Sequence, residues 1–464
     1  MDGFRPDFQQ APCFFFALYA ARVLGVERFG QYGFVMALYA VFAVIADCGL
    51  FLHQTRTFPL LKEKSKSSTF LSQNVLLRLL TGSLSVIIFI AIGFLSGKPA
   101  DVKILVLLLA VALIANNIMG AFSSALYGYE LFGLYGFISM TTQVFAIGLA
   151  SAALYMGTGL VGIGVTQAFV AVMATIAVVI VVSKNIVRPF FKISVKGIKT
   201  VFIKAAPLGI MAIVMMIYYR ENIVILSYIK DDIAVGYYNA AFQIAYALVF
   251  LGITFSTVLL PRISSLLAAK DDYLNTLYNN AFKYLLIAGI GVGFLVYNSS
   301  DYIIELVYST VYLPASKAFS ILIWLVCLAF VNSIQNTLLV AGNANRVLVI
   351  MTTVAAAINL VFSFILIPRF GIIGAAIAVL CGEFYIFVHG FIRNRRFLTT
   401  GGLLSYLWRP VFAAMAGSVV YVFISELPTV IALAAVFAIY ILVLFVLGGL
   451  TKNDLNYFRN TLKI

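Results

Sequence analysis

Charged residues are scarce in this sequence. Asp, Glu, Lys and Arg make up only 10% of its 464 residues, whereas a soluble domain carries about 25%. No polar run is longer than about 20 residues, which leaves no room for a separate soluble domain. Histidine occurs twice, and no metal-ligand spacing, nucleotide-binding loop or nucleophile motif is present. These absences argue against an enzyme and against direct use of ATP, and they predict no cofactor and no metal.

Cysteine is also rare and unpatterned. Cys13, Cys48, Cys327 and Cys381 all lie in apolar segments, and none forms a CxxC pair. We interpret them as small hydrophobic residues.

The net charge of +14 could suggest a nucleic-acid partner. The cations cluster at the ends of apolar segments, however, so we expect no nucleic acid.

Long apolar segments make up most of the chain. Hydrophobic residues account for 63% of it, and the mean hydropathy is +1.06. About 20 apolar residues in a helix span hydrocarbon about 30 Å thick, so the sequence predicts an all-α integral membrane protein with about fourteen transmembrane helices. The expected helices are 12–24, 33–54, 73–97, 102–127, 134–156, 159–183, two within 205–266, 281–299, 316–340, 346–367, 371–392, 404–425 and 428–450.

The first of these segments, Pro12 to Leu24, is short. As a helix it would be about 20 Å long, less than the thickness of the hydrocarbon. A secretory signal peptide fits poorly, because Asp2 and Asp7 outweigh Arg5 in the region before it. We expect a shortened first helix, or a sequence that lacks residues upstream of it.

Lysine and arginine are distributed unequally between the two sets of loops. With the N-terminus in the cytoplasm and alternating helices, the basic groups at 56–78, 184–204 and 393–396 all fall on the cytoplasmic side. The bias is about three to one, and cytoplasmic loops of membrane proteins carry such an excess. The sequence therefore predicts that both termini are cytoplasmic.

The loop at 184–204 combines cations and apolar residues at helical spacing. Its apolar residues form a face separate from the cations, which predicts a basic amphipathic helix on an anionic leaflet. A solvated linker that obeys the charge bias is the other interpretation. The cations are Lys184, Arg188, Lys192, Lys196 and Lys199, and the apolar residues are Phe191, Val195, Ile198 and Phe202.

The two halves of the chain resemble each other. FGQYGFVMALYAVF from Phe29 aligns with VGYYNAAFQIAYALVF from Val235, and GLVGIG from Gly159 aligns with GIIGAA from Gly371. The near-constant shift indicates that helices one to six repeat as seven to twelve, in parallel. We expect an N-terminal lobe at 1–183, a basic amphipathic cytoplasmic linker at 184–204, a C-terminal lobe at 205–396, and two additional helices with a cytoplasmic tail at 397–464.

Two patterns carry a family resemblance. They are ARVLGVERFGQYGF…ADCGL at 21–50, and PLG…YYRENIVILSYIKDDIAVGYYNAAFQIAYALVF…LPRIS in the second half. Both resemble Wzx-type polysaccharide flippases, whose larger group includes MATE-like multidrug exporters and peptidoglycan-precursor flippases. The resemblance covers about residues 17–400. The short first helix departs from the family pattern, in which a full span usually precedes the ARVLG element.

The resemblance implies two six-helix lobes around a central cavity, with two extra C-terminal helices. It implies a flippase that moves undecaprenyl-diphosphate-linked oligosaccharide repeat units to the outer leaflet of the bacterial inner membrane, for O-antigen or capsule biosynthesis. Membrane lipids, a polysaccharide polymerase and chain-length proteins are the further partners that it suggests. Ion-coupled alternating access is the expected mechanism.

Such a cargo requires cations for the diphosphate and hydrogen-bonding groups for the sugar along a wet path. Arg220 lies slightly beyond the middle of its helix, and we expect its guanidinium to face the central cavity, where it would fit phosphate oxygens in pairs. Asp47 and Glu383 have no cation beside them in the sequence, so we expect them to couple transport to an ion. The candidate cations are Arg220, Arg78 and Arg22, and the candidate carboxylates are Asp47, Glu383 and Glu221.

Each candidate also has a structural interpretation. Arg78 and Arg22 could snorkel to the interface. The carboxylates Asp47 and Glu383 could serve only as interhelical contacts. Arg220 and Glu221 could neutralise each other. Asparagines within the helices could bind sugar or connect helices; they are Asn116, Asn117, Asn332, Asn336 and Asn359.

Two other functions are compatible with the sequence. A MATE-like exporter of drugs or small molecules would have the same architecture. A membrane-embedded glycan polymerase or ligase usually needs a sizeable loop domain, and this sequence has none.

Overall fold

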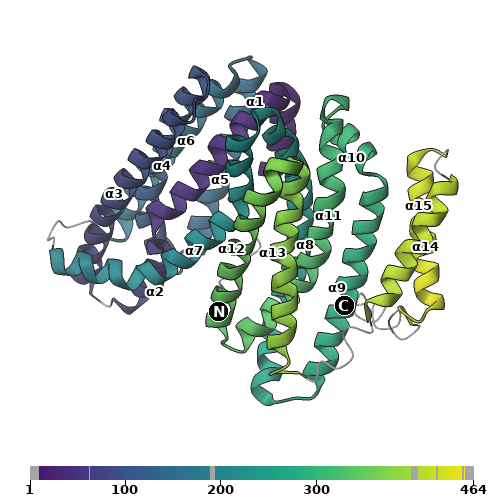
Figure 1. Cartoon of the computed structure of the whole chain (residues 1–464). Helices are drawn as coiled ribbons and strands as arrows, with labels where there is room; N and C mark the ends of the chain where they lie inside the picture. Colours follow the sequence, from purple (N-terminus) through teal and green to yellow (C-terminus); the bar gives the residue numbers. More distant parts are fainter. Residues whose placement is uncertain are drawn as a thin grey trace. The chain divides into compact units, whose positions relative to one another are not determined.

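The computed structural model describes residues 10–61, 63–188, 194–398, 406–424, 427–451 and 454. These residues form helices joined by short loops, and no strand occurs among them (Figure 1). Twelve of the described helices are long and apolar enough to cross a membrane, and Trp408–Ile424 is a shorter apolar helix. The expected all-α membrane architecture is confirmed.

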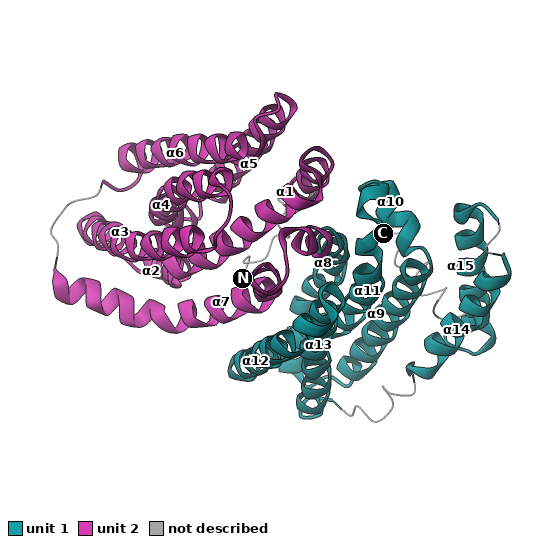
Figure 2. Ribbon diagram, turned by 45° about the horizontal axis from the view of Figure 1, so that its top comes forward, with its two compact units in different colours: residues 1–6, 240–464 teal, residues 7–239 magenta. Residues whose placement is uncertain are grey.

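The chain divides into two compact units, which Figure 2 colours separately. We call residues 7–239 the N-terminal unit and residues 240–464 the C-terminal unit. The boundary falls inside α8 (Asp232–Ala269). The other elements of the N-terminal unit are α1 (Gln10–Asp47), α2 (Leu50–Thr57), η1 (Phe58–Leu60), α3 (Lys64–Leu95), α4 (Ala100–Gly128), α5 (Phe132–Tyr155), α6 (Gly159–Asn185) and α7 (Val195–Ile229).

The C-terminal unit continues from α8 with a second bundle. Its last two helices pack against α9, where the Tyr440 hydroxyl donates to the carbonyl of Ile287 at 2.8 Å. The elements are α9 (Tyr273–Asn298), α10 (Ser300–Val307), η2 (Thr310–Ala315), α11 (Ser316–Ala341), α12 (Asn345–Phe370), α13 (Ile372–Asn394), α14 (Trp408–Ile424) and α15 (Thr429–Val446).

The helix α1 contains the first expected helix and most of the second. Its backbone leaves the helical region at Gly25, where φ is 73° and ψ is 172°, a conformation that glycine adopts without a Cβ clash. The second expected helix ends at Asp47, because Cys48 and Gly49 both have positive φ and separate α1 from α2. Counting α1 as two segments and adding α14 reconciles the twelve long helices with the expected fourteen.

The internal repeat is visible in the packing. In the N-terminal unit, α4 packs against α3 and α6, and α5 packs against α6. In the C-terminal unit, α11 packs against α9 and α13, and α12 packs against α13 in the same way. The short elements α10 and η2 lie between α9 and α11 and have no counterpart between α3 and α4.

The helix α7 is longer than a membrane span requires. Its 35 residues would measure about 52 Å in a straight helix, against about 30 Å of hydrocarbon. It packs against α1, α2 and α3, and Pro207 lies inside it. The predicted amphipathic segment at 184–204 is helical from Val195 onward, and its residues 189–193 lie outside the described part of the chain. The predicted lobe boundaries stay a prediction.

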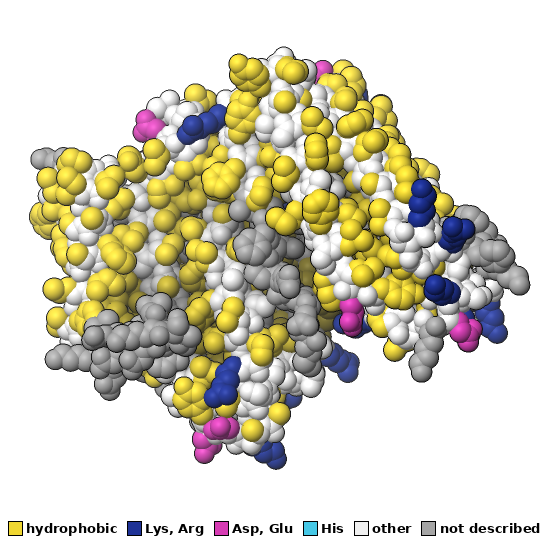
Figure 3. All heavy atoms as spheres, turned by 180° about the vertical axis from the view of Figure 1, so that it is seen from behind, with side chains coloured by type: hydrophobic (Ala, Val, Ile, Leu, Met, Phe, Trp, Pro, Cys, Tyr) yellow, Lys and Arg dark blue, Asp and Glu magenta, His cyan; other side chains and the backbone are white. Residues whose placement is uncertain are grey.

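Apolar side chains cover most of the face in Figure 3, and charged side chains gather near its margins. Leu84 and Ile87 on α3, for example, are 61% and 65% exposed. A soluble protein would rarely present so large an apolar surface to water. This surface therefore suits lipid contact, as the helix lengths do.

Candidate functional site

A fully buried arginine lies inside the N-terminal unit. Only 1% of the Arg78 side chain on α3 is exposed, and its Nη2 lies 2.8 Å from Oδ1 of Asp47 at the end of α1. Its Nη1 donates to the side chain of Asn117 on α4 at 2.9 Å and to the carbonyl of the same residue at 3.1 Å. The pair therefore connects three helices.

This pairing changes two of the sequence-based interpretations. Asp47 has no cation beside it in the sequence, but in the folded chain it pairs with the Arg78 guanidinium. Arg78 does not snorkel to the interface, because its guanidinium is enclosed by protein. Periodicity along one helix could not reveal either contact, since the partners lie on separate helices.

Two glycines provide the space for these side chains. A Cβ on Gly120 would lie 2.8 Å from Nη1 of Arg78, and a Cβ on Gly82 would lie 2.7 Å from Nδ2 of Asn117. Both distances are too short for a carbon atom, so any side chain there would displace the pair. The carboxylate of Asp47 is 31% exposed, so one end of the pair is accessible from outside.

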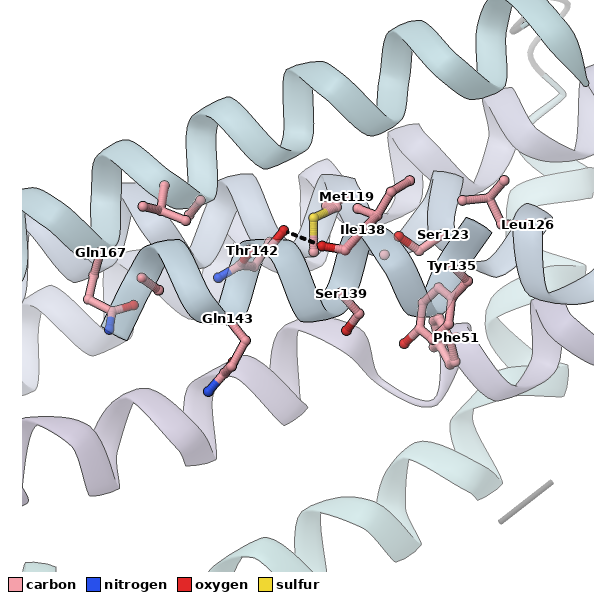
Figure 4. A pocket seen from close by; sticks show the side chains of 15 residues that line it. Phe51, Met119, Ser123, Leu126, Tyr135, Ile138, Ser139, Thr142, Gln143 and Gln167 are labelled. Atoms are coloured by element: carbon pink, nitrogen blue, oxygen red, sulfur yellow. Dashed lines mark hydrogen bonds between the residues drawn. The ribbon is translucent and has the colours of Figure 1, made fainter. Parts of the chain in front are cut away.

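A cavity with a mixed polar and apolar lining includes Gly120 in its wall. Its volume is about 270 Å³, and it is bounded by α4, α5, α6 and Phe51 of α2. Figure 4 shows the side chains of α5 that line it, on one face of the helix. The polar lining residues are Asn116, Ser123, Tyr135, Ser139, Thr142, Gln143 and Gln167.

The cavity lining offers amides and hydroxyls and no formal charge. Such groups donate and accept hydrogen bonds with neutral polar ligands, of which sugar hydroxyls are one class. The volume lies near the lower end of the roughly 300–1,000 Å³ found for small-molecule sites. The cavity could thus hold part of a ligand, and the Arg78–Asp47 pair lies next to its wall at Gly120.

Sequence reasoning identified Asn116 of this lining and missed the α5 residues. Tyr135, Ser139 and Thr142 recur every three or four residues, which is the one signal that could have revealed a polar face. The signal is weak, because hydroxyls in membrane helices often bond to their own backbone. Thr142 does so here, donating to the carbonyl of Ile138 at 2.8 Å (Figure 4).

Glu221 on α7 is a buried carboxylate of the N-terminal unit. It is 6% exposed, and neither of its carboxylate oxygens has a hydrogen-bond partner among the described residues. Its neighbour Arg220 is partly exposed. The two therefore form no hydrogen-bonded local pair.

The remaining candidates are not among the residues that line the cavity. Glu383 on α13, in the C-terminal unit, is 7% exposed and accepts a hydrogen bond from Nδ2 of Asn332 on α11 at 2.7 Å. It makes the interhelical contact that was one of its two interpretations. Arg22 is exposed and lies three residues before the break of α1 at Gly25.

Comparison with solved structures identifies the fold. The chain is similar to the lipid II flippase MurJ in an inward closed conformation, with a TM-score of 0.76, 16% identity, and coverage of 94% of this chain and 96% of that one. It is also similar to a multidrug resistance MATE family transporter of the MOP superfamily, in an inward-facing conformation, with a TM-score of 0.68, 15% identity, and coverage of 85% and 95%. A MATE transporter of Vibrio cholerae, VcmN, aligns with a TM-score of 0.57, 15% identity, and coverage of 84% and 93%.

One curated relative matches a shorter region. It is an uncharacterized membrane protein of Methanocaldococcus jannaschii, 27% identical over 173 residues, and the match spans 37% of this chain and 34% of the relative.

A family model supplies the assignment. The model described as polysaccharide biosynthesis protein matches residues 13–267, more than half of the 464 residues. The match includes α1 to α7, the Arg78–Asp47 pair and the polar cavity. The expected relation to polysaccharide biosynthesis proteins is confirmed, and the fold is the one seen in the MurJ and MATE structures. The chain therefore belongs to the polysaccharide biosynthesis protein family.

Proposed function

We propose that this protein is a flippase for lipid-linked oligosaccharides in polysaccharide biosynthesis. Its cargo is an undecaprenyl-diphosphate-linked repeat unit, moved from the cytoplasmic to the outer leaflet of the bacterial inner membrane, with both termini cytoplasmic. The observation that carries the proposal is the uncharged polar cavity inside a membrane-spanning member of this family. Similarity to a lipid II flippase supports a lipid-linked cargo.

The cavity and the cations have different tasks in this proposal. Asn116, Ser139 and Gln143 hydrogen-bond sugar hydroxyls, and the cavity volume suits one portion of an oligosaccharide at a time. Arg220 and Arg22 bind the diphosphate, because guanidinium groups pair with phosphate oxygens. Arg78 contributes only when its bond to Asp47 opens, since its charge is otherwise compensated.

Ion coupling resides in the carboxylates. An ion that binds Asp47 competes with Arg78 for its carboxylate, and this gives the protein two states with different charge beside the cavity. Glu221 and Glu383 are further coupling candidates, with Glu221 the stronger because its carboxylate has no hydrogen-bond partner among the described residues. The lobes proposed from the repeat, 1–183 and 205–396, provide the alternating access, and a polymerase and chain-length proteins act on the product.

The test is a gene deletion analysed by leaflet. Loss of the protein should cause lipid-linked repeat units to accumulate on the cytoplasmic leaflet, and expression of the intact chain should restore their arrival outside. If the deletion strain, with no second flippase present, still exported repeat units normally, the proposed flippase function would be wrong.

A small-molecule exporter is the second candidate function. The fold similarity to a multidrug transporter favours it. An exporter predicts that the deletion strain becomes more sensitive to cationic dyes and keeps normal surface polysaccharide. A flippase predicts that the surface polysaccharide is lost.

A further inference from the structure

The beginning of α7 is an amphipathic helix with one buried stripe. Val201, Ala205 and Gly209 are buried at a spacing of four residues. Val201 and Ala205 form an apolar cluster with Leu50 of α2 and Leu77 of α3. The spacing keeps these residues on one face, so this segment is fixed to the N-terminal unit along that face. The helix begins at Val195, where the Ser194 side chain accepts a hydrogen bond from the Gly197 amide at 3.4 Å.

The rest of this helix combines cations with exposed apolar side chains. Lys196, Lys199 and Lys204 are all exposed. Between them, Phe202 and Ile203 are 40% and 58% exposed. We call residues 194–206 the basic segment of α7. Figure 1 shows that it lies near the beginning of α3, at one end of the N-terminal unit.

The chemistry of the basic segment selects one kind of partner. A soluble anion would be attracted by the lysines and would gain nothing from Phe202 and Ile203. A membrane surface with negative headgroups uses both, because apolar side chains enter the acyl boundary while cations stay at the phosphates.

The basic segment is also connected to the candidate site. A Cβ on Gly49 would lie 2.4 Å from the amide nitrogen of Gly209, and a Cβ on Gly209 would lie 2.4 Å from the carbonyl of Cys48. The two backbones therefore cross in direct contact. Cys48 follows Asp47, the carboxylate that pairs with Arg78. A ligand that fixes the start of α7 thus also fixes the residues next to this pair.

We propose that the basic segment of α7 is a binding surface for anionic phospholipid headgroups, and that lipid bound there holds α7 against the Cys48–Gly49 junction. The proposal rests on the membrane location in the proposed function but needs neither the oligosaccharide cargo nor transport.

The experiment measures which lipid lies next to the segment. A Phe202→Trp change, in a background with Trp324→Phe and Trp408→Phe, provides a single fluorophore in the full-length protein. The protein is reconstituted in phosphatidylcholine vesicles that contain brominated phosphatidylglycerol or brominated phosphatidylcholine at equal fractions. Stronger quenching by the brominated phosphatidylglycerol is the expected result.

Matched variants locate the effect. The triple change Lys196→Gln, Lys199→Gln and Lys204→Gln should lower the preference for phosphatidylglycerol about fivefold for each lysine, since each cation near the surface contributes roughly 1 kcal/mol. The control triple Lys103→Gln, Lys317→Gln and Arg369→Gln removes the same charge elsewhere and should leave the preference unchanged.

Three results would overturn the proposal. Equal quenching by the two brominated lipids would show no selection of anionic headgroups. An equal loss in both triple variants would show a general charge effect. If millimolar inorganic pyrophosphate abolished the stronger quenching by brominated phosphatidylglycerol, the segment would be a site for soluble phosphates and not a lipid-binding surface. None of these depends on whether an oligosaccharide is transported, so this proposal and the proposed function fail separately.

Discussion

At the scale of single residues, the Arg78–Asp47 pair determines what substitutions will do. The guanidinium is 1% exposed, and removal of one partner of a buried pair typically costs about 3–5 kcal/mol. Because Asp47 is 31% exposed, we expect Asp47→Asn to destabilise the protein by about 3 kcal/mol, at the lower end of that range. The measurement is the thermal unfolding of detergent-purified protein.

The double variant Arg78→Gln with Asp47→Asn separates stability from coupling. It leaves no lone charge, so it should regain much of the stability lost in Asp47→Asn. If the pair couples transport, the double variant stays inactive in a complementation assay. Full complementation would assign the pair to folding alone.

Arg220 offers a second test at this scale. If its guanidinium binds the diphosphate, Arg220→Ala abolishes export and Arg220→Lys retains part of it, because lysine presents a single point charge. Protein level in the membrane must be measured in each strain. The neighbouring change Glu221→Gln is the control for folding, since the carboxylate has no hydrogen-bond partner among the described residues and its replacement should leave the protein level intact. Normal export by Arg220→Ala would end the claim for this residue.

The residue scale also shows where sequence reasoning stopped. Arg78, Asp47 and Glu221 were all candidates, because an ionisable group in an apolar segment is costly. The sequence could not show which of them meet, since helical periodicity defines the face of one helix and not the neighbour that covers it. The hydroxyl of Thr142 was missed for another reason: it is satisfied by its own helix, and such a hydroxyl carries little information.

At the scale of elements, the crossing of α7 over the junction between α1 and α2 requires glycine. Gly49 and Gly25 both have positive φ, 76° and 73°. A Cβ on Gly49 would meet the backbone of α7, whereas a Cβ on Gly25 would meet nothing within 4 Å. An alanine at Gly49, which is left-handed with ψ 7°, carries strain of roughly 1–2 kcal/mol, and one at Gly25, where ψ is 172°, carries strain of about 1–3 kcal/mol. Gly49→Ala also forces the helices apart, because its Cβ would lie 2.4 Å from the Gly209 amide nitrogen.

We therefore expect Gly49→Ala to lower the unfolding temperature clearly more than Gly25→Ala does. Thermal unfolding of the two purified variants provides the comparison. Equal decreases in the two unfolding temperatures would mean that the backbone contact between α7 and the Cys48–Gly49 junction contributes nothing to stability.

A second element-scale prediction concerns Asp454. Burial alone would raise the pKa of Asp454, but hydrogen bonds from Lys283, Tyr284 and Thr451 outweigh it and lower the pKa from 3.8 to about 2. The Lys283 Nζ lies 2.8 Å from its Oδ2. A depressed folded pKa means that this attachment to α9 is complete above about pH 4 and is lost as the pH falls towards 2.

Asp454→Asn should therefore loosen this attachment at neutral pH by about 2 kcal/mol. Hydrogen exchange of the Thr451 amide, which donates to the Asp454 carboxylate at 2.7 Å, measures the loss. Wild-type protein should show the same faster exchange only near pH 2, after correction for the intrinsic rate. If the Thr451 amide exchanged at the same rate in wild type and variant at pH 7, the Asp454 carboxylate would not hold this attachment to α9.

The elements themselves were largely predictable, and the exceptions have physical causes. Long apolar segments bounded by glycine or charged residues identified most helices. The first expected helix ended at Leu24, directly before the break at Gly25, but helix resumes after Gly25 without the expected gap before residue 33. The sequence places α7 in the second lobe by its repeat, which stays a prediction, and the packing of α7 on α1, α2 and α3 is a tertiary contact that the sequence could not reveal.

At the scale of the whole molecule, the orientation in the membrane is the property that the proposed function most needs. The N-terminal unit supplies two internal references. The side chains of Lys98 and Asp232 pair with each other, so the loop after α3 and the loop after α7 lie at one end of the unit. The Ser68 hydroxyl donates to the carbonyl of Arg188, so the start of α3 and the segment after α6 lie together at the other end.

The distribution of cations assigns these two ends to sides of the membrane. The end with Ser68 and Arg188 carries the basic group at 56–78 and the basic segment of α7, so we expect it in the cytoplasm. Reporter fusions after Ser65, Lys196 and Arg395 should then read cytoplasmic, and fusions after Gly97, Asp231 and Pro428 should read external. Because Lys98 and Asp232 pair directly, Gly97 and Asp231 must give the same answer whichever way the protein is inserted. Opposite readings at those two sites would contradict the fold, whereas a uniform reversal of all six would contradict only the orientation, and with it the direction of transport.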